Sequence, residues 1–245
     1  MNLGLEGKVA FVSGASRGIG LAIARALHAE GCRLALAARG RDGLEAAAAT
    51  MPGSTLHAGD AAVEAPAMIN AAAGDAGLDI LVCNAGSGRS VPPGQETEAE
   101  WRRVLDENLY TSLNMIAAAR PRLNRGGAII CISSIAGLAA LGAPIAYSAA
   151  KAALNAAVKG LARPLAAEGL RINAIAPGNI LFEGGTWDRK LREDRAGVEA
   201  MLAREVAQAR LGNPDEIAAL AVFLASPRAS FITGGIVVAD GGQLR

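Results

Sequence analysis

The chain has 245 residues, which exceeds the usual ~100 to 200 residues of one domain but lies within the reach of a single α/β domain. Its hydrophobic share is 51% with few aromatic residues (4 Phe, 2 Trp and 2 Tyr), so the core must consist of Ala, Leu, Ile and Val in packed layers. Lys and Arg number 24 against 23 Asp and Glu, and the resulting net charge of +1 argues against a nucleic-acid-binding protein.

The first part of the chain alternates between strand and helix patterns. The short apolar run Lys8–Ser13 ends in glycines, and apolar residues from Ile19 to Leu27 then recur at helical spacing until Gly31. Arg33–Ala38 has the composition of a second strand. Together these segments predict a βαβ unit of about thirty residues.

The same alternation continues to the end of the chain. We expect further strands at Ser54–Ala58, Asp79–Cys83, Ala128–Ile132, Arg171–Ile175 and Gly235–Ala239, and helices at Pro66–Ala76, Ala99–Arg120, Tyr147–Glu168 and Asp215–Leu224. Apolar strands that alternate with helices indicate an α/β protein with a parallel sheet of about seven strands, covered by helices on both faces. No composition break divides the chain, so we expect a single domain over residues 1–245.

The stretch 126–150 carries no charged residue and raises the question of a membrane helix. Its glycines, Pro144 and the pair Ser133 and Ser134 divide it into a short strand, a polar loop and a helix start, so we expect no membrane span. Residues 1–8 lack the apolar core of a signal peptide. The 3 cysteines and 2 histidines are widely spaced, which argues against a disulfide framework or a metal site and favours a reducing, cytoplasmic setting.

Glycines cluster where the first strand meets the first helix. Gly14, Gly18 and Gly20 lie in the string SGASRGIG, where the missing Cβ atoms allow a tight turn and let a pyrophosphate approach the amide N–H groups at a helix N-terminus. Similar turns also join strands to helices without any ligand. Because no GxxxxGK string followed by Ser or Thr occurs, ATP and GTP are disfavoured, and a dinucleotide is the expected ligand.

The end of the second strand bears on the choice of dinucleotide. An acid there would bind the adenosine ribose, but this chain has Arg39, and Arg17 inside the glycine turn offers a second cation. Two solvated surface arginines are the alternative interpretation. The pattern predicts NADP(H) in preference to NAD(H).

A tyrosine and a lysine stand four positions apart at a helix start. This spacing puts Tyr147 and Lys151 on one face of the helix. A phenol with a pKa near ~10 needs a neighbouring ammonium to serve as an acid–base group at neutral pH. Ser133 and Ser134 follow the fifth strand at the sheet edge where ligands of open α/β proteins bind. A packed tyrosine beside a surface lysine remains the alternative.

Taken together, these motifs resemble those of the short-chain dehydrogenase/reductase family over essentially the whole chain. The family's TGxxxGxG turn matches residues 13–20, with Ser13 in place of Thr, and its YxxxK motif matches Tyr147 to Lys151. Its NNAG string appears as residues 83–86 with Cys83 in the first position, where we expect a buried packing role. The resemblance implies a single Rossmann-fold domain, in which residues 178–211 form a substrate-binding lid.

The resemblance also implies the site residues. The family's spacing between serine and tyrosine selects Ser134 over Ser133, and the implied catalytic residues are Asn108, Ser134, Tyr147 and Lys151. The implied cofactor-binding residues are Gly14, Ser16, Arg17, Gly18, Ile19, Gly20, Arg39, Asp60, Ala61, Asn84, Ala85, Gly86, Tyr147, Lys151, Pro177, Gly178 and Ile180. The chain departs from the family at Phe182, which replaces the threonine that contacts the nicotinamide end of the cofactor.

By the same resemblance, Tyr147 exchanges a proton with the substrate oxygen as a hydride is transferred, and Ser134 holds that oxygen. Lys151 lowers the phenol pKa and binds the nicotinamide ribose, and Asn108 anchors a water in a proton relay. The implied substrate is a small carbonyl or alcohol compound, and the implied assembly is a homotetramer or homodimer. The charged residues Arg189, Lys190, Arg192 and Arg195 could meet an anionic group, although a solvated helical face is the simpler interpretation.

Within the short-chain dehydrogenase/reductase family, the sequence most resembles 3-oxoacyl-(acyl carrier protein) reductase-like members. A sugar or polyol dehydrogenase and a ketone reductase of secondary metabolism are the alternatives. A hypothesis of another class is a catalytically silent NADP-binding sensor or scaffold, which only Phe182 favours.

Overall fold

The computed structural model describes residues 2–244, and its seven strands form one parallel sheet in the order β3-β2-β1-β4-β5-β6-β7. The strands are β1 (Val9–Ser13), β2 (Arg33–Ala38), β3 (Thr55–Ala58), β4 (Leu78–Cys83), β5 (Leu123–Ile132), β6 (Arg171–Pro177) and β7 (Ile236–Ala239). All the strands expected from the sequence are present, and β5 begins earlier than expected. The order reverses at β1, so the crevice between the carboxyl ends of β1 and β4 is the expected ligand site of such a sheet.

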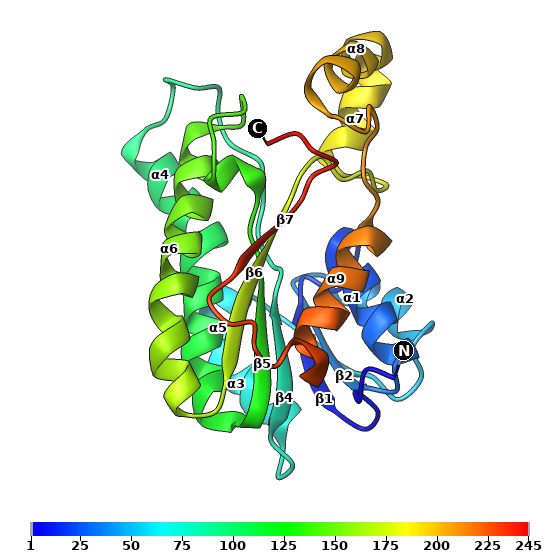
Figure 1. Cartoon of the computed structure of the whole chain (residues 1–245), viewed down its shortest axis with the longest axis vertical. Coiled ribbons are helices and arrows are strands. Elements are labelled where there is room, and N and C mark those ends of the chain that lie inside the picture. The colour runs from blue at the N-terminus through cyan, green and yellow to red at the C-terminus, as the bar shows by residue number, and fades with distance from the viewer. Residues whose placement is uncertain (1, 245) are drawn as a thin grey trace.

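The helices cover both faces of the sheet (Figure 1). They are α1 (Gly18–Ala29), α2 (Arg41–Ala48), α3 (Ala61–Ala73), α4 (Glu98–Leu105), α5 (Thr111–Ala119), α6 (Ile145–Ala167), α7 (Thr186–Glu193), α8 (Arg195–Glu205) and α9 (Pro214–Ala225). The sequence missed α2, a short helix interrupted by a glycine. It also placed the start of α3 at Pro66, whereas the Asp60 carboxylate accepts a hydrogen bond from Ala62 N at 2.9 Å and fixes the start at residue 61.

The expected long helix over residues 99–120 is two helices joined by a π-helical turn. The turn spans Asp106–Tyr110, and Asn108 inside it is fully buried. Single π turns inside helices often occur at functional sites. The local pattern of apolar residues is helical on both sides of the turn, so it could not predict the interruption.

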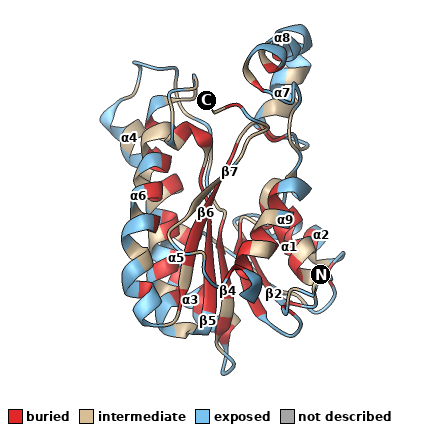
Figure 2. Cartoon of the chain, in the orientation of Figure 1, coloured by how far each residue is buried: buried red, intermediate tan, exposed pale blue. Residues whose placement is uncertain are grey.

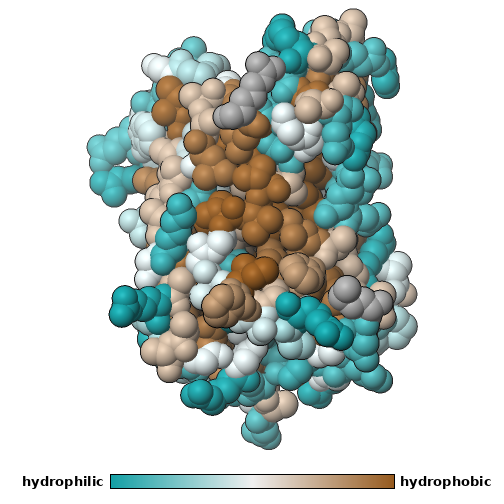
Figure 3. All heavy atoms as spheres, in the orientation of Figure 1, coloured by the Kyte–Doolittle hydropathy of each residue, from teal (hydrophilic) through white to brown (hydrophobic). Residues whose placement is uncertain are grey.

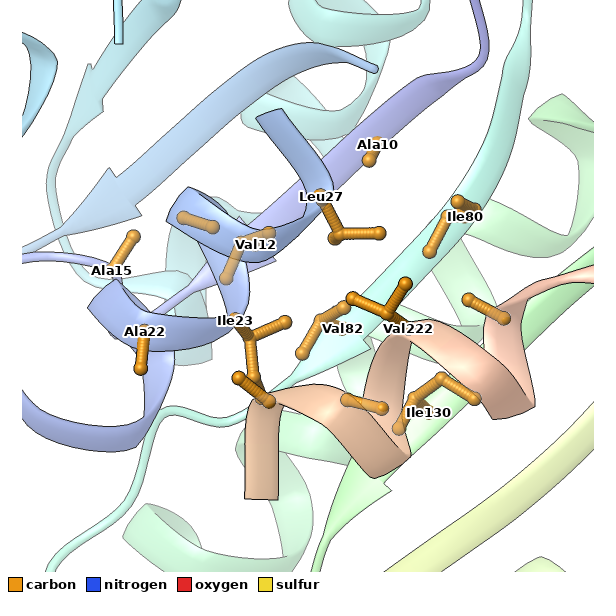
Figure 4. Packing of buried hydrophobic residues seen from close by; sticks show 14 of the residues in the cluster. Ala10, Val12, Ala15, Ala22, Ile23, Leu27, Ile80, Val82, Ile130 and Val222 are labelled. Atoms are coloured by element: carbon orange, nitrogen blue, oxygen red, sulfur yellow. The ribbon is translucent and has the colours of Figure 1, made fainter. Parts of the chain in front are cut away.

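Alternate residues of each strand enter two different core layers. Ala10 and Val12 of β1 pack with α1, α2 and α9 on one face, and Val9 and Phe11 pack with α3, α5 and α6 on the other. In Figure 4 the side chains of Leu27 and Val222 point toward the strands. Figure 2 shows the central strands buried and the outer helix faces exposed, which explains why the strand sequences are apolar throughout.

The uncharged stretch 126–150 folds as the end of β5, a polar loop with a 3-10 turn and the start of α6, as the sequence predicted. Within residues 2–244, each helix is too short or too polar to cross a bilayer. The helices α7 and α8 lie beyond the carboxyl edge of the sheet, in the segment 178–211 (Figure 1).

Candidate active site

The glycine turn between β1 and α1 is packed too tightly for larger residues. A Cβ at Gly20 would lie 2.2 Å from Gly14 O, and a Cβ at Gly14 would lie 2.6 Å from Asn84 Nδ2. Gly14 and Gly18 have φ values of +64° and +56°, in the left-handed region that favours glycine. The turn therefore presents bare backbone to whatever approaches it.

The N-terminus of α1 is open to an anion. Arg17 precedes the helix in an extended conformation, the first turn has no acidic residue, and none of the described hydrogen bonds caps the helix with the Arg17 side chain. The first N–H groups of a helix carry partial positive charge and require acceptors. A pyrophosphate would satisfy them.

Ser13 and Asn84 join the ends of β1 and β4 beside this turn. Ser13 Oγ accepts hydrogen bonds from Asn84 N and Ala85 N at 3.0 and 3.1 Å, so the serine hydroxyl links the strand ends in the position where the family has threonine. Asn84 Nδ2 donates to Ser13 O and Gly14 O at 3.1 and 3.2 Å. These bonds fix the crevice at the reversal of strand order.

A cleft of about 630 Å³ opens over this crevice. The sequence-predicted residues that line it are Gly14, Ser16, Arg17, Ile19, Arg39, Asp60, Ala61, Asn84, Ala85 and Gly86. Both arginines are exposed at its wall, where a phosphate would meet them. An adenine dinucleotide with an additional phosphate fits this cleft. Its pyrophosphate would meet the glycine turn and the uncapped end of α1, and its additional phosphate would meet Arg17 and Arg39.

Phe182 also lines this cleft, and its ring lies between two glycines. A Cβ at Gly18 would be 2.8 Å from the ring, and a Cβ at Gly185 would be 3.0 Å from it. Ile180, which the resemblance assigned to the cofactor, is buried beside Gly212 and borders a separate cavity of about 190 Å³. The structure thus brings Phe182 rather than Ile180 to the glycine turn.

A second cavity, of about 410 Å³, contains the predicted serine and tyrosine. Ser134, Tyr147 and Gly178 line it, and Ser134 lies close enough to Tyr147 to lower the pKa of its phenol. Ser133 Oγ instead donates to Asn155 Oδ1 at 2.6 Å inside the protein. Pro177 is buried at the end of β6, directly before the cavity wall at Gly178. Two hydroxyls therefore converge on one point of this cavity.

Lys151 lies beneath Tyr147 and is only 4% exposed. Its Nζ donates to Ile132 O at 2.8 Å and is 5.8 Å from the centre of the Tyr147 ring. Burial lowers the pKa of Lys151 to about 8. Burial raises the pKa of Tyr147, and the hydrogen bond with Ser134 opposes that rise. Desolvation therefore dominates the Tyr147 pKa in this structure, and the lowering of that pKa by Lys151 stays a prediction.

Asn108 acts on the backbone of the loop after β4. Its Oδ1 accepts from Ser87 N and its Nδ2 donates to Ser87 O, both at 3.0 Å, and Nδ2 also donates to Val104 O at 3.0 Å. The side-chain amide is therefore used in holding the loop that follows Gly86. A water relay from Asn108 to Lys151 stays a prediction.

Cys83, in the place of the family's first Asn, is 1% exposed and pairs with Cys131 on the adjacent strand. A hydrogen bond with Cys131 and burial both raise the pKa of the Cys83 thiol well above its usual value. A thiol of high pKa is a weak nucleophile. The packing role predicted for Cys83 agrees with this environment.

Most cations of the segment 178–211 are paired within their own helices. Arg189 bonds Glu193 at 3.6 Å, Arg192 bonds Asp188 at 2.9 Å and Arg195 bonds Glu199 at 3.6 Å, each at the helical i, i+4 spacing. These pairs support the solvated helical face over an anion-binding site. Lys190 differs, since its Nζ lies 4.5 Å from the centre of the Trp187 ring at the wall of the second cavity.

The sequence reasoning missed two polar residues of the second cavity, Asn179 and Gln243. The sequence does contain a signal for these two residues as part of the site, because Asn179 lies shortly after the end of β6 and Gln243 shortly after the end of β7. The carboxyl ends of parallel strands lie at the same edge of the sheet. The turn that carries Gln243 into the cavity depends on contacts far apart in the sequence.

Comparisons with known proteins agree with this geometry. A family model described as enoyl-(acyl carrier protein) reductase matches residues 14–243. The D-threitol dehydrogenase of Mycolicibacterium smegmatis is 39% identical over 97% of this chain and 93% of its own. The 3-oxoacyl-[acyl-carrier-protein] reductase of Escherichia coli is 36% identical over 98% of this chain and 99% of its own.

Among solved structures, L-sorbose reductase from Gluconobacter frateurii, complexed with NADPH and L-sorbose, superposes with a TM-score of 0.90. It is 31% identical, and the match covers 100% of this chain and 99% of that chain. The family match and these relatives lead to one conclusion: the chain belongs to the short-chain dehydrogenase/reductase family of oxidoreductases.

Proposed function

We propose that this protein is an NADP(H)-dependent enzyme that interconverts a ketone and a secondary alcohol, with Tyr147 as the acid–base residue. One observation carries the proposal: Tyr147 and Ser134 lie together on the wall of one cavity, and Lys151 is buried below the Tyr147 ring. A silent sensor would not need a phenol, a hydroxyl and a buried ammonium at one point, so these groups favour the enzyme.

The substrate oxygen would lie between the Ser134 and Tyr147 hydroxyls, where both can donate to it. In reduction, NADPH held in the cofactor cleft would supply a hydride for the carbonyl carbon, and NADP⁺ would remain. The Tyr147 O–H bond breaks, and its proton passes to the oxygen as negative charge develops there. In oxidation Tyr147 takes that proton back. Ser134 keeps its proton and stabilises the developing oxyanion.

Lys151 has two proposed roles in this site. Its ammonium, buried below the Tyr147 ring, would donate to the ribose of the nicotinamide and stabilise the phenolate after proton transfer. Asn108 holds the loop after Gly86 against α4 and so positions one wall of the cofactor cleft. A water between Asn108 and Lys151 would return the proton to Tyr147.

The preference for NADP(H) rests on Arg17 and Arg39 at the wall of the cofactor cleft. Arg39 stands at the end of β2, where an acid would exclude a 2′-phosphate. The solved L-sorbose reductase holds NADPH, which is consistent with the same choice in this chain. The remaining cofactor contacts would come from Gly14, Ser16, Ile19, Asp60, Ala61, Asn84 and Gly178.

The substrate is bound, in this proposal, under the segment 178–211 acting as a lid. Thr186, Trp187 and Lys190 of α7 and Met201 and Glu205 of α8 already line the cavity that holds Tyr147. The sequence resemblance favours a 3-oxoacyl thioester, with a sugar or polyol as the alternative.

The proposal includes the assembly and location of the protein: it forms a homotetramer or homodimer and acts in the cytoplasm. Strand β7 is an edge of the sheet, and Val238 on it is 40% exposed. Figure 3 shows apolar side chains gathered on the face that includes this edge. An edge strand with an apolar surface favours covering by a second copy.

The test is the substitution Tyr147→Phe, with Tyr110→Phe as the matched control. Tyr110 is 50% exposed in the π-helical turn. We expect Tyr147→Phe to abolish NADPH oxidation with a ketone while NADPH still binds, and Tyr110→Phe to leave both unchanged. Near-normal turnover by the Tyr147→Phe variant would refute the assignment. Tight NADPH binding by the native chain, without turnover of any ketone, thioester or ketose, would favour the silent sensor.

A further inference from the structure

We propose that the substrate is a small polyhydroxylated ketone, or the matching polyol in the reverse direction, and that Asn179 and Gln243 are the residues that select it. The inference rests on the proposed function, because it concerns the substrate half of the same cavity. The reaction is the balanced transfer described above, in which one ketone of the sugar chain gains a hydride and a proton.

The two residues form a side-chain amide pair on the cavity wall. Asn179 Nδ2 donates to Gln243 Oε1 at 2.9 Å, and both residues line the cavity with Ser134 and Tyr147. Gln243 is only 7% exposed. A buried glutamine is uncommon and requires partners for its amide.

A pair of this kind leaves one donor group and one acceptor group for a ligand. Each carboxamide has one oxygen and one NH₂ group, and the bond between the two amides uses one of each. One NH₂ and one C=O therefore remain, whichever way the two amides are turned. A hydroxyl group both donates and accepts, so it can satisfy these two groups together.

The backbone holds both amides in place. Asn179 O accepts from Gly212 N at 2.9 Å, which anchors the residue to the far end of the segment 178–211. The Asp240 carboxylate accepts from Gly242 N at 2.8 Å and from Leu244 N at 2.7 Å. These bonds form a closed turn around Gln243. The pair is therefore organised before a substrate arrives, which lowers the cost of binding.

Two adjacent glycines make this turn. Gly241 and Gly242 have φ values of +65° and +81°, and Gly241 O accepts from Gln208 N at 3.0 Å. After β7 the chain runs toward α7 and then turns back toward α6 (Figure 1).

The lid side of the cavity is polar as well. Thr186, Lys190 and Glu205 line it, and Glu205 is bonded to Arg204 at 2.6 Å. These side chains add donors and acceptors of both charge signs to the cavity wall. An acyl chain would leave the remaining groups of the amide pair, of which Gln243 is buried, without partners, and an unmet buried polar group weakens binding. A chain of hydroxyl groups would meet them, and the apolar residues Leu141 and Trp187 can cover its carbon face.

The experiment measures kcat/KM with NADPH for short-chain ketoses (erythrulose and sorbose), for 2-hexanone as a ketone without hydroxyls, and for acetoacetyl-CoA as a 3-oxoacyl thioester. The variant is Gln243→Met, which keeps the volume and removes the amide. The matched control is Gln95→Met, the same change at an exposed position that lines none of the three cavities described above. The change in tryptophan fluorescence on addition of sorbitol gives a second readout, of binding, since Trp187 is on the cavity wall.

We expect the native enzyme to prefer the ketoses. Gln243→Met should lower kcat/KM for them by about 10- to 100-fold while changing the value for 2-hexanone by less than about threefold. It should also weaken sorbitol binding without changing NADPH binding, and Gln95→Met should behave as the native protein does.

Better turnover of acetoacetyl-CoA or 2-hexanone than of every ketose would overturn the substrate class and leave the proposed reaction intact. An equal loss on all substrates would show a structural role for Gln243. Absence of turnover with all of them, together with unchanged fluorescence in sorbitol, would overturn both the substrate class and the proposed reaction.

Discussion

Replacing Lys151 with methionine is expected to stabilise the fold near neutral pH while it removes activity. Burial lowers the pKa of Lys151 from its usual 10.5 to about 8, a difference of roughly 2.5. One pKa unit corresponds to about 1.4 kcal/mol, so holding the charged ammonium in this site costs the fold about 3 kcal/mol at pH 7. Methionine has a similar length and no charge to desolvate.

The gain is partly offset by a lost hydrogen bond. Lys151 Nζ donates to Ile132 O at 2.8 Å, and removing this donor costs about 1 kcal/mol. The expected net stabilisation by Lys151→Met at pH 7 is therefore about 2 kcal/mol. A residue that is kept at such a cost is consistent with a functional role, because active sites commonly trade stability for activity.

The same reasoning fixes the pH dependence. Between about pH 8 and pH 10.5 the unfolded chain keeps the lysine proton and the folded chain does not, so the native protein becomes more stable as the pH rises through this range. The Lys151→Met variant lacks this contribution. Its advantage should shrink as the pH rises and disappear by about pH 10.

Urea unfolding followed by far-ultraviolet circular dichroism, at equal protein concentrations and at about pH 7 and about pH 10, measures both effects. The control is Lys159→Met on the exposed side of α6, which should change the free energy of unfolding by less than about 0.5 kcal/mol. A Lys151→Met variant that is no more stable than the native protein at pH 7, or whose advantage is the same at both pH values, would refute the reasoning.

Three further substitutions test the cofactor cleft. Gly20→Ala puts a Cβ 2.2 Å from Gly14 O, so we expect the Kd of NADPH to rise about tenfold or more in a fluorescence titration, and an unchanged Kd would contradict the role of the turn. Arg39→Asp should move the ratio of kcat/KM for NADPH over NADH by about 10- to 100-fold toward NADH; an unaltered ratio would show that Arg39 does not meet the 2′-phosphate. Phe182→Thr removes the ring packed on Gly18, so the free energy of unfolding should fall by about 1–2 kcal/mol while the Kd of NADPH does not rise. Weaker NADPH binding by that variant would mean that the ring itself holds the cofactor.

The local sequence predicted most of the architecture because the relevant rules act over a few residues. Apolar runs bounded by glycines indicated all the strands, and the four-residue spacing of Tyr147 and Lys151 placed both on one helix face. The sequence pattern did not predict the helix α2, because this helix is short, contains Gly43 and buries only Leu44 and Ala47.

Other properties depended on packing between distant segments. The sequence identified Phe182 as a departure from the family, but its position against Gly18 follows from how residues 178–185 return over the glycine turn. The spacing of Tyr147 and Lys151 places a lysine near the phenol, but it does not say how far the site is desolvated or which carbonyl binds the ammonium.

The sequence by itself therefore determined the order of strands and helices, the glycine turn and the chemistry available at the sheet edge, since these depend on neighbours in the chain. Only the tertiary structure decided how deeply Lys151 is buried, where the Phe182 ring lies and that Gln243 joins Asn179 beside Tyr147. Burial and convergence are set by contacts between residues far apart in the sequence, which no local pattern records.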